Sequence, residues 1–263
     1  MARPTIALLT DFGHVDHYAG TLKGVLLSLC PDATLVDITH DIPPHDVLTA
    51  ALELAACYRY FPPATIFLVV VDPGVGSARR GLVAEAGEYR FVAPDNGVLS
   101  LVFQDARPRK VVDLTERRYA RPTVSKTFEG RDRFAPAAGW LAKGIELTAM
   151  GRPVSQWHVL PVPEPEVSGQ RMAGQVLRVD RFGNLVTNID RKRFEVFRQD
   201  APIQIAIDGR AVDRLVATYG EAPEGALCAL FGSTDHLEIA LNGGSAATAL
   251  SLGRGAGVQI DRT

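Results

Sequence analysis

Apolar runs and amphipathic segments alternate along the first 150 residues. The continuous apolar run Ile6–Leu9 predicts a short buried strand, and Leu35–Ile38 is expected to form a second strand. Apolar residues at helical spacing predict helices over 18–29 and Val47–Tyr60. The run Thr65–Val71 is apolar and rich in β-branched residues, as expected of a central parallel strand covered on both faces. This β-α-β-α-β order predicts a layered α/β domain with right-handed crossovers and a mostly parallel central sheet.

Further elements are expected in the same half of the chain. The pattern predicts strands at Leu82–Ala86, Arg90–Ala93 and Val111–Leu114. It also predicts a helix from about Phe134 to Lys143. Asp46 directly precedes the apolar run that begins at Val47, and its carboxylate is expected to cap that helix.

The pattern changes at residue 161, where three prolines fall within five residues. Such a segment is stiff and extended, so we place a linker at 161–169 between an N-terminal domain, 1–160, and a C-terminal domain, 170–263. Beyond the linker, strands dominate, with one short helix around Ser245–Ser251. The strands are expected at Gly174–Asp180, Leu185–Ile189, Ile203–Asp208, Ala226–Phe231, Leu237–Ala240 and Val258–Ile260. The smaller domain is therefore β-rich, and a barrel and a sandwich both fit.

Composition narrows the class of protein. The 263 residues are 46% hydrophobic with a net charge of −2, which excludes a disordered chain and argues against binding nucleic acid through a broad basic surface. Neither a signal peptide nor an apolar run long enough to span a membrane is seen. The scattered Cys30, Cys57 and Cys228 are expected to be buried thiols, typical of a cytoplasmic protein.

Polar residues follow the predicted strands at the edge where open α/β sheets bind ligands. Asp11 follows the first strand, and Asp72 follows the third, with Arg79 across a glycine-rich loop. Two other segments, 127–132 and 180–184, are dense in polar residues and glycine. Many carboxylates with few lysines suit a cation or a polyhydroxylated ligand better than a phosphate.

Each segment also has a purely structural interpretation. An Asp after a strand is commonly a turn former or a helix cap. The glycine-rich loop lacks the spacing of a dinucleotide site and the lysine of a phosphate loop. His14, Asp16 and His17 are possible metal ligands, but no further ligand lies at a readable spacing, and polar residues at a helix start are the better interpretation.

Seven motifs then occur in order along the chain, and an eighth, LEIALNGGSAA, follows at 237–247. They are TDFG at 10–13, DHYAGTLKG at 16–24, DITHDIPP at 37–44, VVDPGVGSARR at 70–80, APDNGVLS at 93–100, TFEGRDRFAPAA at 127–138 and DRFGNLVTNI at 180–189. Together they resemble the S-adenosyl-L-methionine (SAM) hydroxide adenosyltransferase family, which is related to fluorinase and chlorinase.

The resemblance implies an N-terminal α/β domain, a smaller C-terminal β-barrel domain, and a homotrimer with active sites at subunit interfaces. It implies cleavage of SAM to adenosine and L-methionine by water or hydroxide at the ribose 5′ carbon, with no metal or organic cofactor. SAM is then the small-molecule partner, and nucleic acid and membrane are not expected.

Residue roles follow from the same resemblance. Asp11 would hold the ribose hydroxyls, Asp180 and Ser233 the amino and carboxylate end of methionine, and Asn184 the adenine end. Phe182 would pack on the ligand. Phe128 offers a second flat face for a base or a sulfonium cation.

The catalytic set of the family departs from its usual form here. Asp72 and Arg79 match two members of an Asp-Arg-His set that positions the attacking water. The usual Thr-Phe-His-Gly-Arg-Asp motif carries Glu129 in place of its histidine. Glu129 can act as the base or only pair with Arg79, and both readings stay open.

Three alternatives to SAM hydrolysis therefore stay open. They are a SAM- or adenosine-binding protein impaired by Glu129, a protein that binds some other nucleoside, and a halogenase, which two acids near the nucleophile disfavour.

Overall fold

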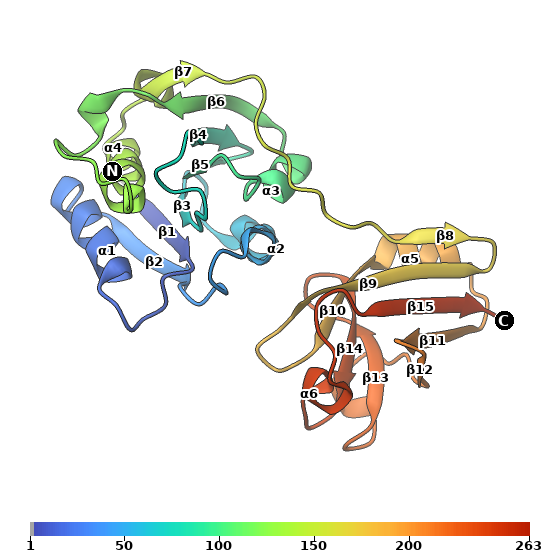
Figure 1. Cartoon of the computed structure of the whole chain (residues 1–263). Helices are drawn as coiled ribbons and strands as arrows, with labels where there is room; N and C mark the ends of the chain where they lie inside the picture. Colours follow the sequence, from blue (N-terminus) through green and yellow to red (C-terminus); the bar gives the residue numbers. More distant parts are fainter. Residues whose placement is uncertain (1–2) are drawn as a thin grey trace. The chain divides into compact units, whose positions relative to one another are not determined.

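The computed structural model describes residues 3–263, which form two compact units divided between Pro161 and Val162 (Figure 1). Within the segment expected to be a linker, strand β8 (Glu166–Ser168) pairs antiparallel with β9 (Arg171–Val179). The C-terminal part of that segment therefore belongs to the sheet of the second unit. None of the helices within residues 3–263 is both long and apolar enough to cross a membrane.

A seven-stranded sheet in the order β2-β1-β3-β5-β4-β6-β7 forms the centre of the first unit. Its strands are β1 (Thr5–Thr10), β2 (Thr34–Thr39), β3 (Ile66–Val70), β4 (Gly81–Ala86), β5 (Tyr89–Pro94), β6 (Pro108–Leu114) and β7 (Gly151–Pro153). The four strands β2, β1, β3 and β5 are parallel, and β4, β6 and β7 add antiparallel pairs. The predicted α/β domain and all six predicted strands are confirmed.

Helices cover both faces of this sheet, which explains why its central strands β1 and β3 are almost continuously apolar. Successive side chains of a strand point to opposite faces, so Leu8 packs in one core cluster and Leu9 in the other. Helices α1 (Tyr18–Leu29) and α4 (Ala135–Ala142) contribute to the cluster of Leu8, and α2 (Val47–Cys57) and α3 (Ser100–Asp105) to that of Leu9.

Two helix starts bear on the predictions. Asp46 caps α2 as expected, because its carboxylate accepts a hydrogen bond from the N–H of Thr49. The helix expected from Phe134 is preceded by a π-helical turn, Gly130–Phe134, directly after Glu129. Such turns are rare and frequently mark functional sites.

The second unit is a nearly closed antiparallel barrel, which decides between the barrel and the sandwich. Besides β8 and β9, its strands are β10 (Leu185–Asp190), β11 (Ile203–Ile207), β12 (Arg210–Val212), β13 (Leu227–Phe231), β14 (His236–Leu241) and β15 (Gly257–Arg262). They follow the order β12-β11-β15-β9-β10-β14-β13. Beyond β12, the chain at Leu215 bridges Ala229 of β13, so the two ends of the sheet meet.

Two short helices complete the barrel unit. Helix α6 (Ala246–Leu250) lies where a short helix was predicted. Helix α5 (Arg191–Arg198) was missed, because its sequence is mostly charged and only Phe194 and Phe197 are buried.

Candidate active site

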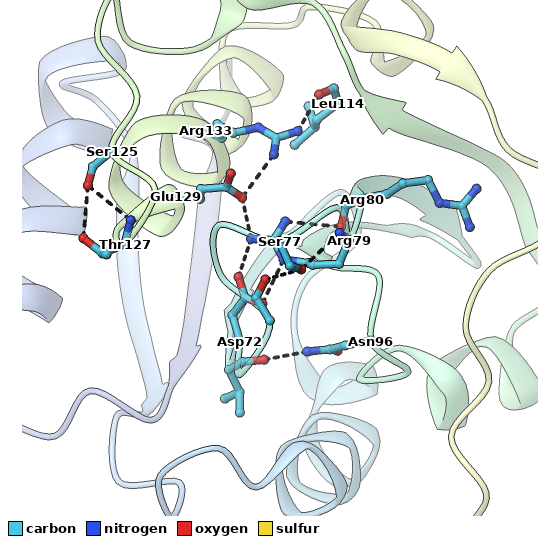
Figure 2. A network of polar contacts seen from close by, with 12 residues as sticks. Asp72, Ser77, Arg79, Arg80, Asn96, Leu114, Ser125, Thr127, Glu129 and Arg133 are labelled. Atoms are coloured by element: carbon cyan, nitrogen blue, oxygen red, sulfur yellow. Dashed lines mark hydrogen bonds and ion pairs between the residues drawn. The ribbon is translucent and has the colours of Figure 1, made fainter.

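Asp72, Arg79 and Glu129 form one ion-pair cluster, shown in Figure 2. Nε of Arg79 donates to Oδ1 of Asp72 at 2.8 Å, and Nη2 donates to Oδ2. The same Nη2 donates to Oε2 of Glu129 at 2.5 Å. The three side chains are only 6 to 11% exposed, so these charged contacts are poorly screened by solvent.

The loop from Asp72 to Arg79 needs its glycines to reach this position. Gly76 has a φ of +77°, and a Cβ there would collide with the carbonyl oxygen of Lys126. The loop therefore packs directly against the segment that leads to Glu129. This close approach brings together two motifs that are 50 residues apart in sequence.

Arg133 is a further member of the cluster. Its Nη1 donates to Oε2 of Glu129 at 3.1 Å, and its Nη2 donates to the carbonyl of Leu114 at 2.7 Å. Figure 2 shows Glu129 between the guanidinium groups of Arg79 and Arg133. Within residues 3–263, Oε1 of Glu129 has no hydrogen-bond partner, so it remains an acceptor. The sequence analysis missed Arg133, although its spacing of four from Glu129 is a signal for an ion pair.

A hollow of about 260 Å³ lies beside this cluster. It is lined by Asp11, Phe12, Tyr18, Pro44, His45, Val70, Asp72, Val75, Thr127, Phe128, Glu129 and Gly130. The structure therefore brings together four of the predicted site residues of the first unit, which are Asp11, Asp72, Phe128 and Glu129. Arg79 is not among the residues that line this hollow, but it contacts Asp72 and Glu129. Arg79 and Arg133 line a separate hollow of about 640 Å³.

Asp11 is fixed by the loop before α2. Its Oδ2 accepts a hydrogen bond from the N–H of His45 at 2.8 Å, and His45 holds a φ of +68°, which is uncommon for a residue other than glycine. Among the described residues, no side chain or N–H bonds Oδ1 of Asp11. This oxygen can accept a hydrogen bond from a ligand hydroxyl in the hollow.

A polar network that is buried at Thr10 and His40 and exposed at Asp37 supports the strand that ends before Asp11. Oγ1 of Thr10 lies 2.7 Å from Nδ1 of His40, and Nε2 of His40 lies 3.1 Å from Asp37. Lys23 donates to the other oxygen of Asp37 at 2.6 Å. Burial alone would raise the pKa of Asp37, but Lys23 and His40 outweigh it and hold that pKa below its ordinary value.

Phe128 contributes part of the wall of the hollow. It is 7% exposed, and its ring packs edge-on against Phe12 at 5.8 Å and against Tyr18 at 5.1 Å between centroids. Together they form an aromatic surface beside the acidic residues, which suits a flat base or a sulfonium cation.

Asp132 anchors the segment that bears Phe128 and Glu129. Its side chain is fully buried and accepts hydrogen bonds from the N–H of Ser125 and from the guanidinium of Arg131. Burial alone would raise the pKa of Asp132, but Arg131 and the Ser125 N–H hold it below its ordinary value of 3.8.

The second unit carries its predicted site residues on two turns. In the turn between β9 and β10, Oδ1 of Asp180 accepts from the N–H groups of Phe182 and Asn184, and Oδ2 accepts from Nδ2 of Asn184 at 2.8 Å. Phe182 is 78% exposed, an unusual position for a large apolar ring. Ser233 is exposed in the turn between β13 and β14.

Glu238 and Tyr219 lie next to the first of these turns and were missed by the sequence analysis. The Tyr219 hydroxyl donates to Oε2 of Glu238 at 3.0 Å and lies 3.5 Å from Nδ2 of Asn184. Burial raises the pKa of Glu238, and the hydrogen bond from Tyr219 offsets this only in part. Burial and the charge of Glu238 raise the pKa of Tyr219 to about 12.

The polar residues at the start of α1 do not assemble a metal site. His14 is exposed and lies 3.8 Å from Asp41, and His17 packs on Tyr18 with 4.6 Å between ring centroids. Nowhere in residues 3–263 do three His, Cys, Asp or Glu side chains gather in a way that could hold a metal ion.

Models of one family match both units. Its N-terminal domain, described as SAM hydroxide adenosyltransferase, matches residues 6–151, and its C-terminal domain matches residues 174–259. The chain is 38% identical to (R)-S-adenosyl-L-methionine hydrolase of Thermus thermophilus over 97% of this chain and 98% of that relative. A second hydrolase of that name, from Salinispora tropica, is also 38% identical, over 95% and 94% of the two chains.

More distant relatives and solved structures agree with this relation. Fluorinase of Nocardia brasiliensis is 29% identical over 98% of this chain and 97% of the relative. The crystal structure of a conserved protein from Thermotoga maritima, described as uncharacterized, has a TM-score of 0.92 at 34% identity, over 98% of this chain and all of that one. Since both domain models match in order along one chain, the protein belongs to the SAM hydroxide adenosyltransferase family.

Proposed function

We propose that this protein hydrolyses SAM to adenosine and L-methionine. Relatives that are 38% identical along nearly the whole chain are named (R)-S-adenosyl-L-methionine hydrolase. The observation that carries the proposal is the cluster of Asp72, Arg79 and Glu129 beside a hollow, with Oε1 of Glu129 left as an acceptor. Such an acceptor can hold a water molecule by its hydrogens.

The chemistry is a displacement at carbon. A water oxygen forms a bond to the ribose 5′ carbon while the bond from that carbon to the sulfonium sulfur breaks, and the electron pair leaves with sulfur as a neutral thioether. Because the leaving group needs no proton, alignment and water control dominate catalysis. Glu129 and Asp72 accept the hydrogens of the water, and one proton is finally released to solvent.

Arg79 fixes the two carboxylates in place for this task. Its guanidinium touches both, so they share one rigid partner and cannot drift apart. The cationic sulfonium would be attracted by the same acids. Asp11 would hold the ribose hydroxyls through its unbonded Oδ1, and Phe128 would face the base or the sulfonium.

The remaining contacts are assigned to the barrel unit of a neighbouring chain in a homotrimer. Asp180 and Ser233 would hold the methionine end, Phe182 would pack on the ligand and Asn184 would contact the adenine end. Two observations support an incomplete site in a single chain. The hollow of about 260 Å³ is smaller than pockets that enclose drug-sized ligands, about 300–1,000 Å³. Phe182 is largely exposed, so its ring is accessible to a ligand or to a neighbouring chain.

We expect no metal or organic cofactor to take part. A cytoplasmic location stays a prediction from the sequence.

A second candidate is a protein that binds SAM or adenosine but cleaves SAM slowly. It is favoured by the contact of Glu129 with both Arg79 and Arg133, because a purely structural ion-pair cluster would make the same contacts. Halogenation is disfavoured, because a halide placed beside Asp72 and Glu129 would be repelled.

Incubation of the purified protein with SAM, followed by chromatography, separates these functions. Hydrolysis predicts adenosine and methionine in equal amounts without added halide. Intact SAM despite tight binding would support the second candidate. A 5′-halogenated adenosine formed only with halide would establish halogenation instead.

A further inference from the structure

Glu238 is a buried acid in the barrel unit for which the proposed chemistry has no use. It lies on β14, and the residue is only 5% exposed. Its carboxylate accepts the hydroxyl of Tyr219 and lies so close to Gly232 that a Cβ at Gly232 would overlap it. Glu238 therefore touches Tyr219 and also the residue next to Ser233, in the turn from β13 to β14.

A chain of hydrogen bonds runs from Glu238 to the other ligand-binding turn. Because the Tyr219 hydroxyl donates to Glu238, its oxygen is free to accept from Nδ2 of Asn184 at 3.5 Å. The same Nδ2 donates to Asp180 at 2.8 Å. Both hydrogens of the Asn184 amide are thus used inside the protein, and its carbonyl Oδ1 is the group left for a ligand.

The opposite amide orientation is disfavoured by charge. It would place the Asn184 carbonyl oxygen next to the Asp180 carboxylate, and two acceptors would then face each other. The same oxygen would also face the Tyr219 hydroxyl, whose hydrogen is already donated to Glu238. Glu238 therefore sets the direction of the Tyr219 hydroxyl, and that hydroxyl with Asp180 sets the direction of the amide.

We propose that Glu238 is a positioning residue that makes the ligand-binding face of the barrel selective for a base with an amino group. Through Tyr219 it holds Asn184 with its carbonyl Oδ1 as the unused acceptor, so that a hydrogen-bond donor such as the exocyclic amine of adenine is favoured and a carbonyl at the same place is rejected. This inference rests on the proposed function, in which Asn184 faces the adenine end.

Burial and the charge of Asp180 disfavour this carboxylate, and Tyr219, Arg178 and His236 offset them only in part. Burying an acid near Asp180 costs free energy, and an apolar side chain of similar length would avoid that cost. Glu238→Met should therefore keep the barrel folded while removing the acceptor for Tyr219. If this variant loses the selectivity for the base while its unfolding temperature is not below that of wild type, Glu238 has a positioning role and not a merely structural one.

The test compares the binding of adenosine and inosine by titration calorimetry, since inosine carries a carbonyl where adenosine has its amine. Wild type is expected to prefer adenosine by about 10- to 100-fold. In Glu238→Met the Tyr219 hydroxyl can turn, and in Tyr219→Phe it is absent, so that Asp180 alone orients the Asn184 amide. The preference for adenosine should then fall at least about fivefold. Glu238→Gln retains an acceptor for Tyr219 and should keep most of the preference for adenosine.

Asn188→Ala is the matched control, because Asn188 is also a buried polar residue of the barrel, and its Oδ1 accepts from the N–H of Gln175. It should lower the unfolding temperature and leave the preference unchanged.

The inference is overturned if Glu238→Met binds adenosine and inosine in the wild-type ratio, or if Asn188→Ala loses the preference equally. If the wild-type protein binds adenosine but does not cleave SAM, the proposed hydrolysis is contradicted. The role of Glu238 is still tested in that case, by the ratio of adenosine to inosine binding. Wild type that binds neither nucleoside would contradict both proposals.

Discussion

Arg133 lies one helical turn after Glu129 and donates to its Oε2 at 3.1 Å, the oxygen that Arg79 also contacts. Both guanidinium groups thus hold the same carboxylate oxygen. The second oxygen, Oε1, is left without a partner within residues 3–263, and Glu129 lines the hollow beside Asp72. This division of the two oxygens allows Glu129 to be held firmly and still to accept a hydrogen from water.

Glu129 is expected to be important for the rate of SAM cleavage. Glu129→Ala removes the acceptor for water and should lower kcat about 10²- to 10⁴-fold, the usual contribution of a positioned base. Glu129→His, which offers a neutral imidazole acceptor, should retain more activity than Glu129→Ala. Steady-state kinetics of product formation measure both. Full activity in Glu129→Ala would show that Glu129 is not the base.

Arg133 should act on the rate through Glu129. Arg133→Met removes one of two guanidinium partners and lets the carboxylate move, so we expect kcat to fall about 3- to 10-fold. KM should stay within about twofold, because Arg133 does not line the hollow that contains Asp11 and Phe128. Arg133→Lys keeps the charge and should recover part of the loss. An equal effect on KM and kcat in Arg133→Met would contradict this role.

Asp132 should stabilise the protein in a way that depends on pH. Because its pKa in the folded state lies below the ordinary value of 3.8, its ionised form stabilises the fold above that pH. That contribution is lost as the pH falls through the folded pKa. Asp132→Asn should therefore reduce the free energy of unfolding by about 1–3 kcal/mol at neutral pH, with a difference that narrows below pH 3.8.

Denaturant unfolding at several pH values measures this difference. Glu116→Gln is the control, since Glu116 is half-exposed in the same unit and lies 3.8 Å from Arg118. It should change the free energy of unfolding by no more than about 0.5–1 kcal/mol at any of these pH values. A difference for Asp132→Asn that does not change with pH would contradict the ionic role.

A homotrimer with shared sites makes a complementation prediction. Asp72→Asn damages the first unit and Asp180→Asn the second, so each variant alone should be nearly inactive. If every site combines the first unit of one chain with the barrel of the next, trimers co-expressed from both variants should recover about a quarter of the wild-type sites. Activity no higher than that of the separate variants, or a single-chain mass in solution, would contradict shared sites.

The order of elements in the first unit could be predicted because strands buried on both faces are continuously apolar. Thr65–Val71 contains β3 (Ile66–Val70) for this reason. Helix α5 could not be predicted in the same way, since its stability comes from two buried phenylalanines, Phe194 and Phe197, within a charged segment. The barrel likewise depends on a bridge between Leu215 and Ala229 that no local pattern indicates.

The site was predictable only where a motif carried it. Asp72, Arg79 and Glu129 lie in motifs, and the structure brings them into contact. The unequal use of the two oxygens of Glu129 required three-dimensional geometry. Tyr219 lies outside the motifs, 19 residues before its partner Glu238, so their hydrogen bond could not be read from spacing.

Cleavage of SAM in oxygen-18 water tests the central claim most directly. Attack of water on the ribose 5′ carbon predicts adenosine that carries one oxygen-18 atom at its 5′ hydroxyl, with unlabelled methionine, as measured by mass spectrometry of the separated products. The claim would be contradicted if the wild-type protein gave unlabelled adenosine or left SAM intact. Formation of 5′-methylthioadenosine in place of adenosine would also contradict it.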